Sequence, residues 1–500
     1  MVAGRGRFVS REFRVTGVRC RGSSGGGARG VGYNAGMLPV LIAGFVFVCA
    51  AQAQTLDWKA VEEESMRHFQ ALLRLDTSDP PGVEFPAVEY LKKVLDAEGI
   101  PNEVLSIDPK RPNIVARLKG SGAKRPILIM GHTDVVNVDA KKWTFPPFGA
   151  VRDGGYVYGR GTVDDKDNLV ASLMTMVLLK RLKTPLDRDV IFLAEAGEEG
   201  SVRFGIQFMV EKHFDKIDAE YCLAEGGGVS RAGGKLRFAN IGTAEKIPYA
   251  VKLVATGPAG HGSRPLRTNA IAHLAGAVAK IAAWQPPMRL NDTTRTYFER
   301  LATLSSPDEA ERYNNIVNPE KTAAIQEYFA DKEPGHNSML RTSISPNMFQ
   351  AGYRVNVIPS EATATLDIRA LPDEKMDAFM EQIRGVINDP AVKVLREARD
   401  TRPGAAPSPL DNVVFRTLEA MVKKHYGGVV TLPLMQTGAT DMAYLRAKGM
   451  ACYGIGPAVD VEDGPKGFGA HSDQERILES EFRRFVRFQY ETVTALAGQR

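Results

Sequence analysis

Cysteine is scarce in this chain. Its 500 residues include four cysteines, and only Cys222 and Cys452 lie beyond residue 53. No C-x-x-C pair occurs, which excludes a zinc site built from thiolates. The two remaining cysteines could pair in an exported protein, but two buried, reduced thiols are the simpler interpretation.

Lysine is absent from the first 53 residues, which hold seven arginines and one glutamate. The almost wholly apolar run at residues 37–51 is too short for a comfortable membrane span. It leads into a small-x-small Ala-Gln-Ala pattern that ends at Ala53. We therefore predict a signal peptide at residues 1–53, cleaved near Ala53, and export to the periplasm or the extracellular space with no membrane contact afterwards. An uncleaved anchor and a true start at Met37 stay open.

The chain has no excess of positive charge once this leader is removed. Lysine plus arginine falls from 64 to 57, aspartate plus glutamate falls from 59 to 58, and the formal net charge changes from +5 to about −1. A nucleic-acid partner is therefore not predicted. Residues 228–235 (GVSRAGGK) lack the spacing and the final Ser or Thr of a P-loop, which argues against a nucleotide enzyme.

Length and hydrophobic pattern predict more than one domain, because 500 residues exceed one ordinary core. Apolar strands alternate with helices up to about residue 243. This alternation predicts an α/β domain with a mainly parallel central sheet. Helices are expected at residues 57–74, 86–98 and 169–182, and strands at 114–118, 127–130, 190–194 and 219–224.

A different pattern begins near residue 244. Its elements follow the order β-α-β-β-α-β, the ferredoxin-like arrangement, with additional helical material at residues 291–340. The expected strands are 249–255, 342–352, 362–369 and 392–397, and the expected helices are 269–284 and 373–387. A Pro-rich linker at 402–409 precedes a return to the α/β pattern. We predict a catalytic domain formed by residues 54–243 and 402–500, with residues 244–401 inserted into it.

Histidines and carboxylates follow five strand ends of the predicted large domain. Ligands collect at the carboxyl ends of strands in open α/β sheets, so we expect these side chains to lie together. Two imidazoles with several carboxylates and no thiolate suit zinc, or cobalt and manganese, and the set suffices for two ions if one carboxylate bridges them. Each residue alone has an ordinary explanation, such as helix capping by an Asp pair. The residues are His132, Asp134, Asp164, Asp165, Glu198, Glu199, Glu225 and His471.

Seven short motifs, in order, carry a resemblance to a known family. They are GHTDVV, YGRGTVDDK, EAGEEG, LAEGG, GHGS, NVIP and GAHS. Over residues 57–497 the chain resembles the di-zinc metallopeptidases of clan MH, which include aminoacylase, carboxypeptidase G and succinyl-diaminopimelate desuccinylase. Residues 143–166 most resemble exported members that act on N-acyl amino acids and small peptides, as Gly-Xaa carboxypeptidases do. The resemblance implies a zinc-binding α/β domain with an inserted lid or dimerisation domain.

The same resemblance implies the ligands of two zinc ions. His132 and Glu225 would bind one ion, Glu199 and His471 would bind the other, and Asp164 would bridge them. Many relatives carry Asp-Glu where this chain has Ala224 and Glu225, so the ligand is kept while its neighbour differs.

Further roles follow from the resemblance. Asp134 would hydrogen-bond His132 and set its tautomer, and Glu198 would be the general base. A cis peptide would follow Asp164. In the inserted domain, His261 would help to stabilise the oxyanion, often in the partner subunit's site. Asn356 and Arg369 would hold the substrate, and the planar guanidinium of Arg369 suits a carboxylate.

These observations predict a zinc-dependent enzyme, with cobalt or manganese as substitute metals. It would cleave the amide bond of N-acyl amino acids or small peptides with a free carboxylate, and a homodimer through the inserted domain is one expected assembly. Two alternatives remain: a non-catalytic, metal-dependent binding protein on the same fold, and a serine hydrolase using Ser263. The absence of a G-x-S-x-G elbow argues against the second.

Overall fold

The computed structural model describes residues 56–397 and 402–499. The predicted signal peptide lies outside these residues. Within them, no helix has the length and apolar character that a membrane span requires.

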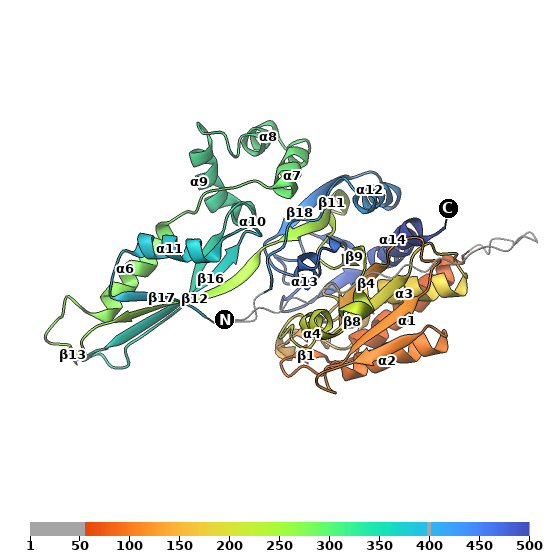
Figure 1. The fold of residues 1–500 in the computed structure, drawn as a ribbon, viewed down its shortest axis with the longest axis horizontal. Helices are drawn as coiled ribbons and strands as arrows, with labels where there is room; N and C mark the ends of the chain where they lie inside the picture. The colour runs from red at the N-terminus through yellow and green to blue at the C-terminus, as the bar shows by residue number, and fades with distance from the viewer. Residues whose placement is uncertain (1–55, 398–401, 500) are drawn as a thin grey trace, which may run out of the picture. The chain divides into compact units, whose positions relative to one another are not determined.

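A ten-stranded mixed sheet forms the centre of the large α/β region (Figure 1). The strand order is β2-β3-β8-β4-β9-β19-β11-β10-β20, and β18 pairs with β11. The strands β8, β4, β9 and β19 run parallel to one another. The strands are β2 (Asn102–Leu105), β3 (Asn113–Leu118), β4 (Ile127–His132), β8 (Val190–Glu195), β9 (Tyr221–Ala224), β10 (Gly228–Ala232), β11 (Lys235–Glu245), β18 (Val430–Gln436), β19 (Ala451–Gly454) and β20 (Ala458–Asp460).

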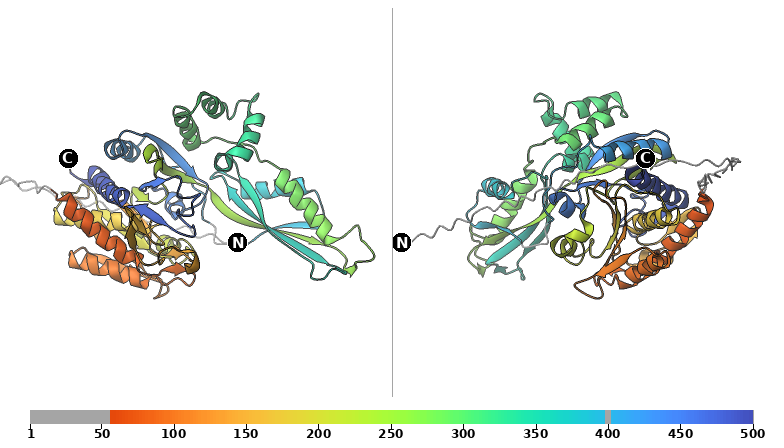
Figure 2. Two further views of the ribbon diagram at one scale, coloured as in Figure 1. Left: turned by 180° about the vertical axis from the view of Figure 1, so that it is seen from behind. Right: turned by 45° about the vertical axis from the view of Figure 1, so that its right-hand side comes forward.

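Helices cover both faces of this sheet. Ile127 and Ile129 of β4 pack into one core, which also contains side chains of α1, α2, α3, α12 and α14. The alternate residues Leu128 and Met130 pack into a second core with α4, α5 and α13. Figure 2 shows α1 and α2, in orange, side by side from two directions. The helices are α1 (Trp58–Leu73), α2 (Phe85–Ala97), α3 (Lys166–Arg181), α4 (Ile206–Lys212), α5 (Phe214–Ile217), α12 (Val413–His425), α13 (Met442–Ala447) and α14 (Glu479–Ala497).

The central strands are apolar because both of their faces are covered. Every residue of β4 and of β8 is buried. Their carboxyl ends, at His132 and Glu195, are paired in register, which places the residues that follow them at one edge of the sheet. The predicted α/β class is confirmed.

A second, four-stranded sheet has the order β14-β16-β12-β17, with all neighbours antiparallel. Helices α6 and α11 share its core. This is the β-α-β-β-α-β arrangement expected from the sequence. The elements are β12 (Ile247–Thr256), α6 (Ala270–Ala283), β14 (Ser343–Ala351), β16 (Glu361–Ala370), α11 (Met376–Ile387) and β17 (Val392–Arg396). A single residue, Lys246, joins β11 to β12.

The helical material expected at residues 291–340 forms four helices that pack mainly against the large sheet. Tyr297, Phe298 and Phe329 share a core with Leu432 and Met435 of β18. Part of the inserted sequence therefore extends the large α/β region. The helices are α7 (Asp292–Ala302), α8 (Pro307–Asn314), α9 (Thr322–Lys332) and α10 (Pro334–Met339).

Short elements complete the described chain. Cys222 and Cys452 are buried and free, and they lie opposite each other on the parallel strands β9 and β19. The short elements are β1 (Ser78–Asp79), β5 (Val135–Val136), η1 (Ala140–Lys142), β6 (Val151–Asp153), β7 (Tyr156–Tyr158), β13 (Gly260–His261), β15 (Val357–Ile358) and β21 (Arg476–Leu478).

Candidate metal centre

His132 ends β4, and its ring has a defined tautomer. Its Nδ1 lies 2.9 Å from the backbone carbonyl oxygen of Asp134. A carbonyl only accepts hydrogen bonds, so Nδ1 carries the proton and Nε2 carries a free lone pair. This leaves Nε2 able to bind a metal ion, as the sequence predicted.

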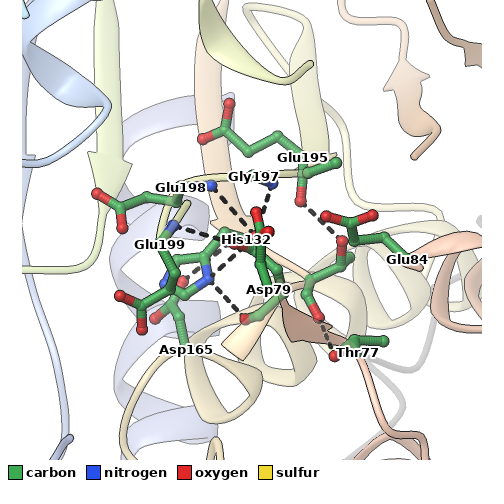
Figure 3. Close-up of polar contacts among 12 residues, drawn as sticks. Thr77, Asp79, Glu84, His132, Asp165, Glu195, Gly197, Glu198 and Glu199 are labelled. Carbon is green, nitrogen blue, oxygen red and sulfur yellow. Dashed lines mark hydrogen bonds and ion pairs between the residues drawn. The ribbon is translucent and has the colours of Figure 1, made fainter. Parts of the chain in front are cut away.

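Asp134 makes the predicted hydrogen bond to His132 through its backbone carbonyl, and its carboxylate has a further task. Its Oδ1 lies 3.7 Å from Nδ1 of His132, beyond a hydrogen bond. The two carboxylate oxygens instead accept the backbone amides of Gly197, Glu198 and Glu199, at 2.8, 3.2 and 3.0 Å (Figure 3). Asp134 therefore orients His132 through its main chain and anchors the loop of the two glutamates through its side chain.

A buried charge cluster supports this loop from behind. Nη2 of Arg111 lies 2.5 Å from a carboxylate oxygen of Asp79 and 2.5 Å from one of Glu84. A Cβ atom at Gly200 would lie 2.0 Å from Oδ2 of Asp79. A side chain at position 200 would therefore displace the Asp79 carboxylate from Arg111. Because Arg111 pairs with both carboxylates of this cluster, the cluster does not need a metal ion to balance its charge.

Asp164 lies between the two predicted histidine ligands. Its Oδ1 is 3.2 Å from Nε2 of His132, and its Oδ2 is 3.0 Å from Nε2 of His471. The same nitrogen of His471 is 2.8 Å from Oε1 of Glu199. The peptide bond after Asp164 is cis, as the resemblance implied. One carboxylate that faces two imidazoles is the arrangement that a bridging ligand requires.

Glu225 and Glu198 lie on the His132 side of the centre. One carboxylate oxygen of each lies within 4.8 Å of the other and of a ring nitrogen of His132. Over residues 56–397 and 402–499, neither a hydrogen bond nor an ion pair is found to the carboxylate of Glu225. This partly buried carboxylate lines a cavity beside His132, so it is free to act as a metal ligand.

The electrostatics of the centre favour cations. Hydrogen bonds to Asp164 and Glu199 raise the pKa of His471 to about 10, against the opposing effect of its burial. Burial also raises the pKa of Glu225 well above its ordinary value, and the nearby Glu198 carboxylate adds to the shift. So many carboxylates around two imidazoles need positive charge nearby. The set of oxygen and nitrogen donors suits zinc, cobalt or manganese.

The predicted base, Glu198, has a partner that the sequence did not reveal. Its Oε1 forms an ion pair with Nη2 of Arg402, which also lies 3.2 Å from Oδ1 of Asp441. Burial raises the pKa of Glu198 well above its ordinary value; Asp441 raises it further, and Arg402 opposes the shift. Arg402 begins the segment expected to be a linker, where composition gives no sign of an arginine that reaches the metal centre.

The loops that carry Asp164 and His471 are held together by a buried ion pair. Nη1 of Arg160 lies 2.7 Å from Oε2 of Glu475, and Nη2 of Arg160 donates to the carbonyl of Ser472 at 2.7 Å. Glu475 also accepts the backbone amide of Val163, one residue before Asp164, at 2.8 Å. His471 itself has φ +57°. This left-handed conformation costs a non-glycine residue about 1–3 kcal/mol and persists only where its surroundings impose it.

We expect Glu475→Gln to weaken metal binding. The amide removes the negative charge that faces Arg160 and cannot accept all of the backbone and side-chain donors that the carboxylate accepts. Loss of such supporting contacts typically lowers metal affinity by roughly 10- to 100-fold. Titration with a competing chelator measures the change. Glu479→Gln is the matched control, because Glu479 pairs with Arg152 at the surface. Equal affinity in both variants would contradict the role of Glu475.

The three predicted residues of the inserted region lie on or next to the second sheet. His261 lies on β13, which pairs antiparallel with β15, and the amide of Gly262 donates to the carbonyl of Asn356, just before β15, at 2.9 Å. Nε of Arg369 lies 3.0 Å from Oδ2 of Asp367. Within the described part of the chain these residues make no polar contact with the metal-centre residues. The structure therefore brings together seven of the ten predicted site residues, and the roles of His261, Asn356 and Arg369 stay predictions.

Comparisons with known proteins agree with this geometry. A probable carboxypeptidase S-like 2 of Dictyostelium discoideum is 31% identical over 330 residues, which make up 63% of this chain and 62% of the relative. The human N-fatty-acyl-amino acid synthase/hydrolase PM20D1 is 27% identical over 381 residues, 74% of each protein. The chain thus spans less than two thirds of the Dictyostelium protein and about three quarters of the human one.

The fold has solved counterparts. The M20 family metallo-carboxypeptidase Sso-CP2 from Sulfolobus solfataricus superposes with a TM-score of 0.64 at 19% identity, over 86% of this chain and 98% of that one. The relatives support the predicted class of enzyme, a metal-dependent hydrolase of amide bonds. The model of peptidase family M20/M25/M40 matches residues 128–495, well over half of the sequence, so the chain belongs to this family.

Proposed function

We propose that the protein hydrolyses the amide bond of N-acyl amino acids or small peptides that carry a free carboxylate, with two zinc ions bound. The observation that carries the proposal is the position of Asp164 between His132 and His471, with Glu198 beside the first of them. The human relative is named for N-fatty-acyl-amino acids and the Dictyostelium relative for a carboxypeptidase. Both names refer to enzymes that release a free amino acid from an amide.

The residues of the centre would have separate roles in metal binding and catalysis. His132 and Glu225 would hold one metal ion, Glu199 and His471 the other, and Asp164 both. When bound, the ions supply Lewis acidity, which makes a water molecule more acidic and polarises the scissile carbonyl. Because Asp134 anchors the glutamate loop through its backbone amides, Glu198 and Glu199 stay in fixed positions relative to His132.

Glu198 would move the proton. A glutamate that is not a metal ligand can take a proton from the attacking water and then give it to the amine that leaves. Its partner Arg402 would fix the direction of the carboxylate. A serine mechanism has less support: Ser263 lies 2.7 Å from Nδ1 of His261, but no carboxylate among the described residues orients that exposed ring, and the base–orienter contact is part of a triad.

Export and self-association belong to the same proposal. The leader composition supports export, and the four-stranded sheet supports a homodimer only through the resemblance that names it a dimerisation domain. Both are tested on the mature chain, by locating it in cell fractions and by measuring its mass in solution.

The substrate's carboxylate gives the experiment that tests the function. Zinc-loaded protein should hydrolyse N-acyl amino acids and cleave the matching carboxamides much more slowly, because Arg369 would lose its bidentate partner. In Arg369→Ala this preference should largely vanish. Initial rates on four pairs of substrate and enzyme decide the matter. Equal discrimination by both enzymes would remove Arg369 from the site, and no hydrolysis of any such amide would reject the function.

A further inference from the structure

The loop after β18 ends at a buried aspartate whose carboxylate is turned away from the helix that follows it. Asp441 occupies the N-cap of α13 and is 2% exposed. An N-cap aspartate usually accepts a backbone amide of the first turn, but the side chain of Asp441 makes no such hydrogen bond. The hydroxyl of Thr440 accepts the amide of Met442 instead, at 3.2 Å. The carboxylate of Asp441 is therefore available for another contact.

That contact is with Arg402, the partner of the predicted base. Nη2 of Arg402 lies 3.2 Å from Oδ1 of Asp441 and forms an ion pair with Oε1 of Glu198. The same nitrogen donates to the backbone carbonyl of Glu198 at 3.1 Å. The side chain of Arg402 is 14% exposed, so little water is available to replace these contacts. The guanidinium of Arg402 thus joins the loop of the base to the loop that ends at Asp441.

Glu245, the last residue of β11, fixes the loop that carries Asp441. Its side chain is buried. One of its carboxylate oxygens accepts the amide and the hydroxyl of Thr440, at 2.6 and 2.7 Å. The other accepts Nη1 of Arg446, on α13, at 2.7 Å. Glu245 therefore holds both the residue before Asp441 and the helix after it.

Further contacts hold Arg446 in turn. Its Nη2 donates to the carbonyl of Cys452 at 3.0 Å, and its Nε donates to the hydroxyl of Ser408 at 3.2 Å. Buried polar networks of this kind make one geometry rigid. A purely structural role, in which Glu245 ties α13 to β11, accounts for these contacts. It does not account for an N-cap carboxylate that faces the partner of the base.

We propose that Asp441 is a positioning residue for the base Glu198, that it acts through Arg402, and that Glu245 holds it in place. The inference rests on the proposed function and adds the residues that fix the position of its base. A general base must lie within hydrogen-bond reach of the proton that it takes, and a displacement of about 1 Å can lower a rate about 100-fold. A guanidinium held by Glu198 alone would move with it, whereas one that Asp441 also holds would not.

The first test is Asp441→Asn, which keeps the shape of the side chain and removes its charge. Charge-assisted hydrogen bonds are roughly twice as strong as neutral ones, so Arg402 should lose much of its second anchor. We expect kcat to fall at least about tenfold, with KM within about twofold of the native value and the metal content unchanged. An unchanged kcat, or a loss confined to KM or to metal content, would overturn the proposal.

Asp189→Asn is the matched control. Asp189 lies directly before β8, at the opposite end of that strand from the base, and pairs with Arg117 at 3.0 Å. The change removes the same charge from an aspartate that also holds an arginine. It should leave kcat near native, and an equal loss of kcat in the two variants would contradict a specific role for Asp441.

The second test repeats Asp441→Asn in the Glu198→Gln variant. Once the base is gone its position no longer matters, so the residual rate should change less than about twofold. A structural role would instead lower the rate by the same factor in both backgrounds, and that result would overturn the proposal.

Two substitutions of Thr440 test the part of Glu245. Thr440→Val removes the hydroxyl at nearly constant volume, and Thr440→Ser keeps it. We expect Thr440→Val to share the loss of kcat and Thr440→Ser to keep most of the native rate. Equal rates in these two variants would overturn the role of Glu245.

Melting temperatures separate this inference from the proposed function. If the protein hydrolyses none of the expected amides, the proposed function fails, but the contacts can still be tested. Asp441 and Glu198 share Arg402, so the shifts in melting temperature caused by Asp441→Asn and Glu198→Gln should not add in the double variant. Additive shifts would show that Asp441 does not act on Glu198 and would reject the inference.

Discussion

Glu198→Gln should keep both metal ions and lose activity by roughly two to four powers of ten, the usual contribution of a general base. The amide has nearly the shape of the carboxylate, and its oxygen can still accept a hydrogen bond from Arg402. It cannot take a proton from water. The loss should therefore fall on kcat, while KM changes little, and elemental analysis should find the metal content of the native protein.

Glu199→Gln is the control for this experiment because it sits one residue away with a different task. Its carboxylate faces His471 at 2.8 Å, so the amide should weaken binding of one metal ion. Comparison of the two variants would then distinguish the loss of the general base from the loss of a metal ligand. A near-native rate in Glu198→Gln, together with full metal content in Glu199→Gln, would mean that the base and the ligand have been assigned to the wrong glutamates.

Much of the large region follows from local sequence pattern. The apolar runs that end at His132 and Glu195 predict buried strands, and the structure places both in the middle of the sheet with their carboxyl ends in register. Because ligands follow strand ends in such sheets, the sequence alone predicts that His132, Asp164, Glu199, Glu225 and His471 lie together. The hydrophobic runs, their period and the direction of the strands are enough to predict this cluster of ligands.

The supporting contacts could not be predicted, because they join distant segments. Arg402 reaches Glu198 across 204 residues, and Arg160 reaches Glu475 across 315. No periodicity marks either arginine, and composition placed the first in a linker. The packing of α7 on β18 could not be predicted from the sequence either, because it also joins segments that are far apart in the chain. Even the role of Asp134 is divided between its main chain and its side chain, a distinction that residue identity alone cannot supply.

His261→Ala should lower kcat about a hundredfold or more and leave the metal content unchanged. The hydroxyl of Ser263 and the backbone amide of Ser263 both point at Nδ1 of His261, at 2.7 and 3.1 Å. The amide can only donate, so Nδ1 accepts and the neutral ring carries its proton on Nε2. That exposed N–H is a donor ready for an oxyanion. Removing one such donor typically costs about 2.7–4 kcal/mol in the transition state.

The control for this variant is His273→Ala. His273 lies on α6, which packs on the four-stranded sheet, and pairs with Asp389 at 2.6 Å. Its loss therefore tests the effect of removing a histidine from the same region without changing the β13–β15 pair. It should leave kcat near native. A role for His261 in packing alone predicts the reverse pattern, with a lower melting temperature and an unchanged kcat.

Mixing two inactive variants shows whether His261 acts within its own chain or in a partner. If it reaches the metal centre of a second subunit, a mixed dimer of His261→Ala and Glu198→Gln contains one site with both a native base and a native donor. Such mixtures should regain up to about a quarter of the native activity when subunits exchange freely, because half of the dimers are mixed and each has one complete site. If exchange is proven by mass and the mixture stays inactive, His261 does not act across subunits. It would then have to meet the oxyanion of its own chain, by closure of the four-stranded sheet over the ends of β4 and β8.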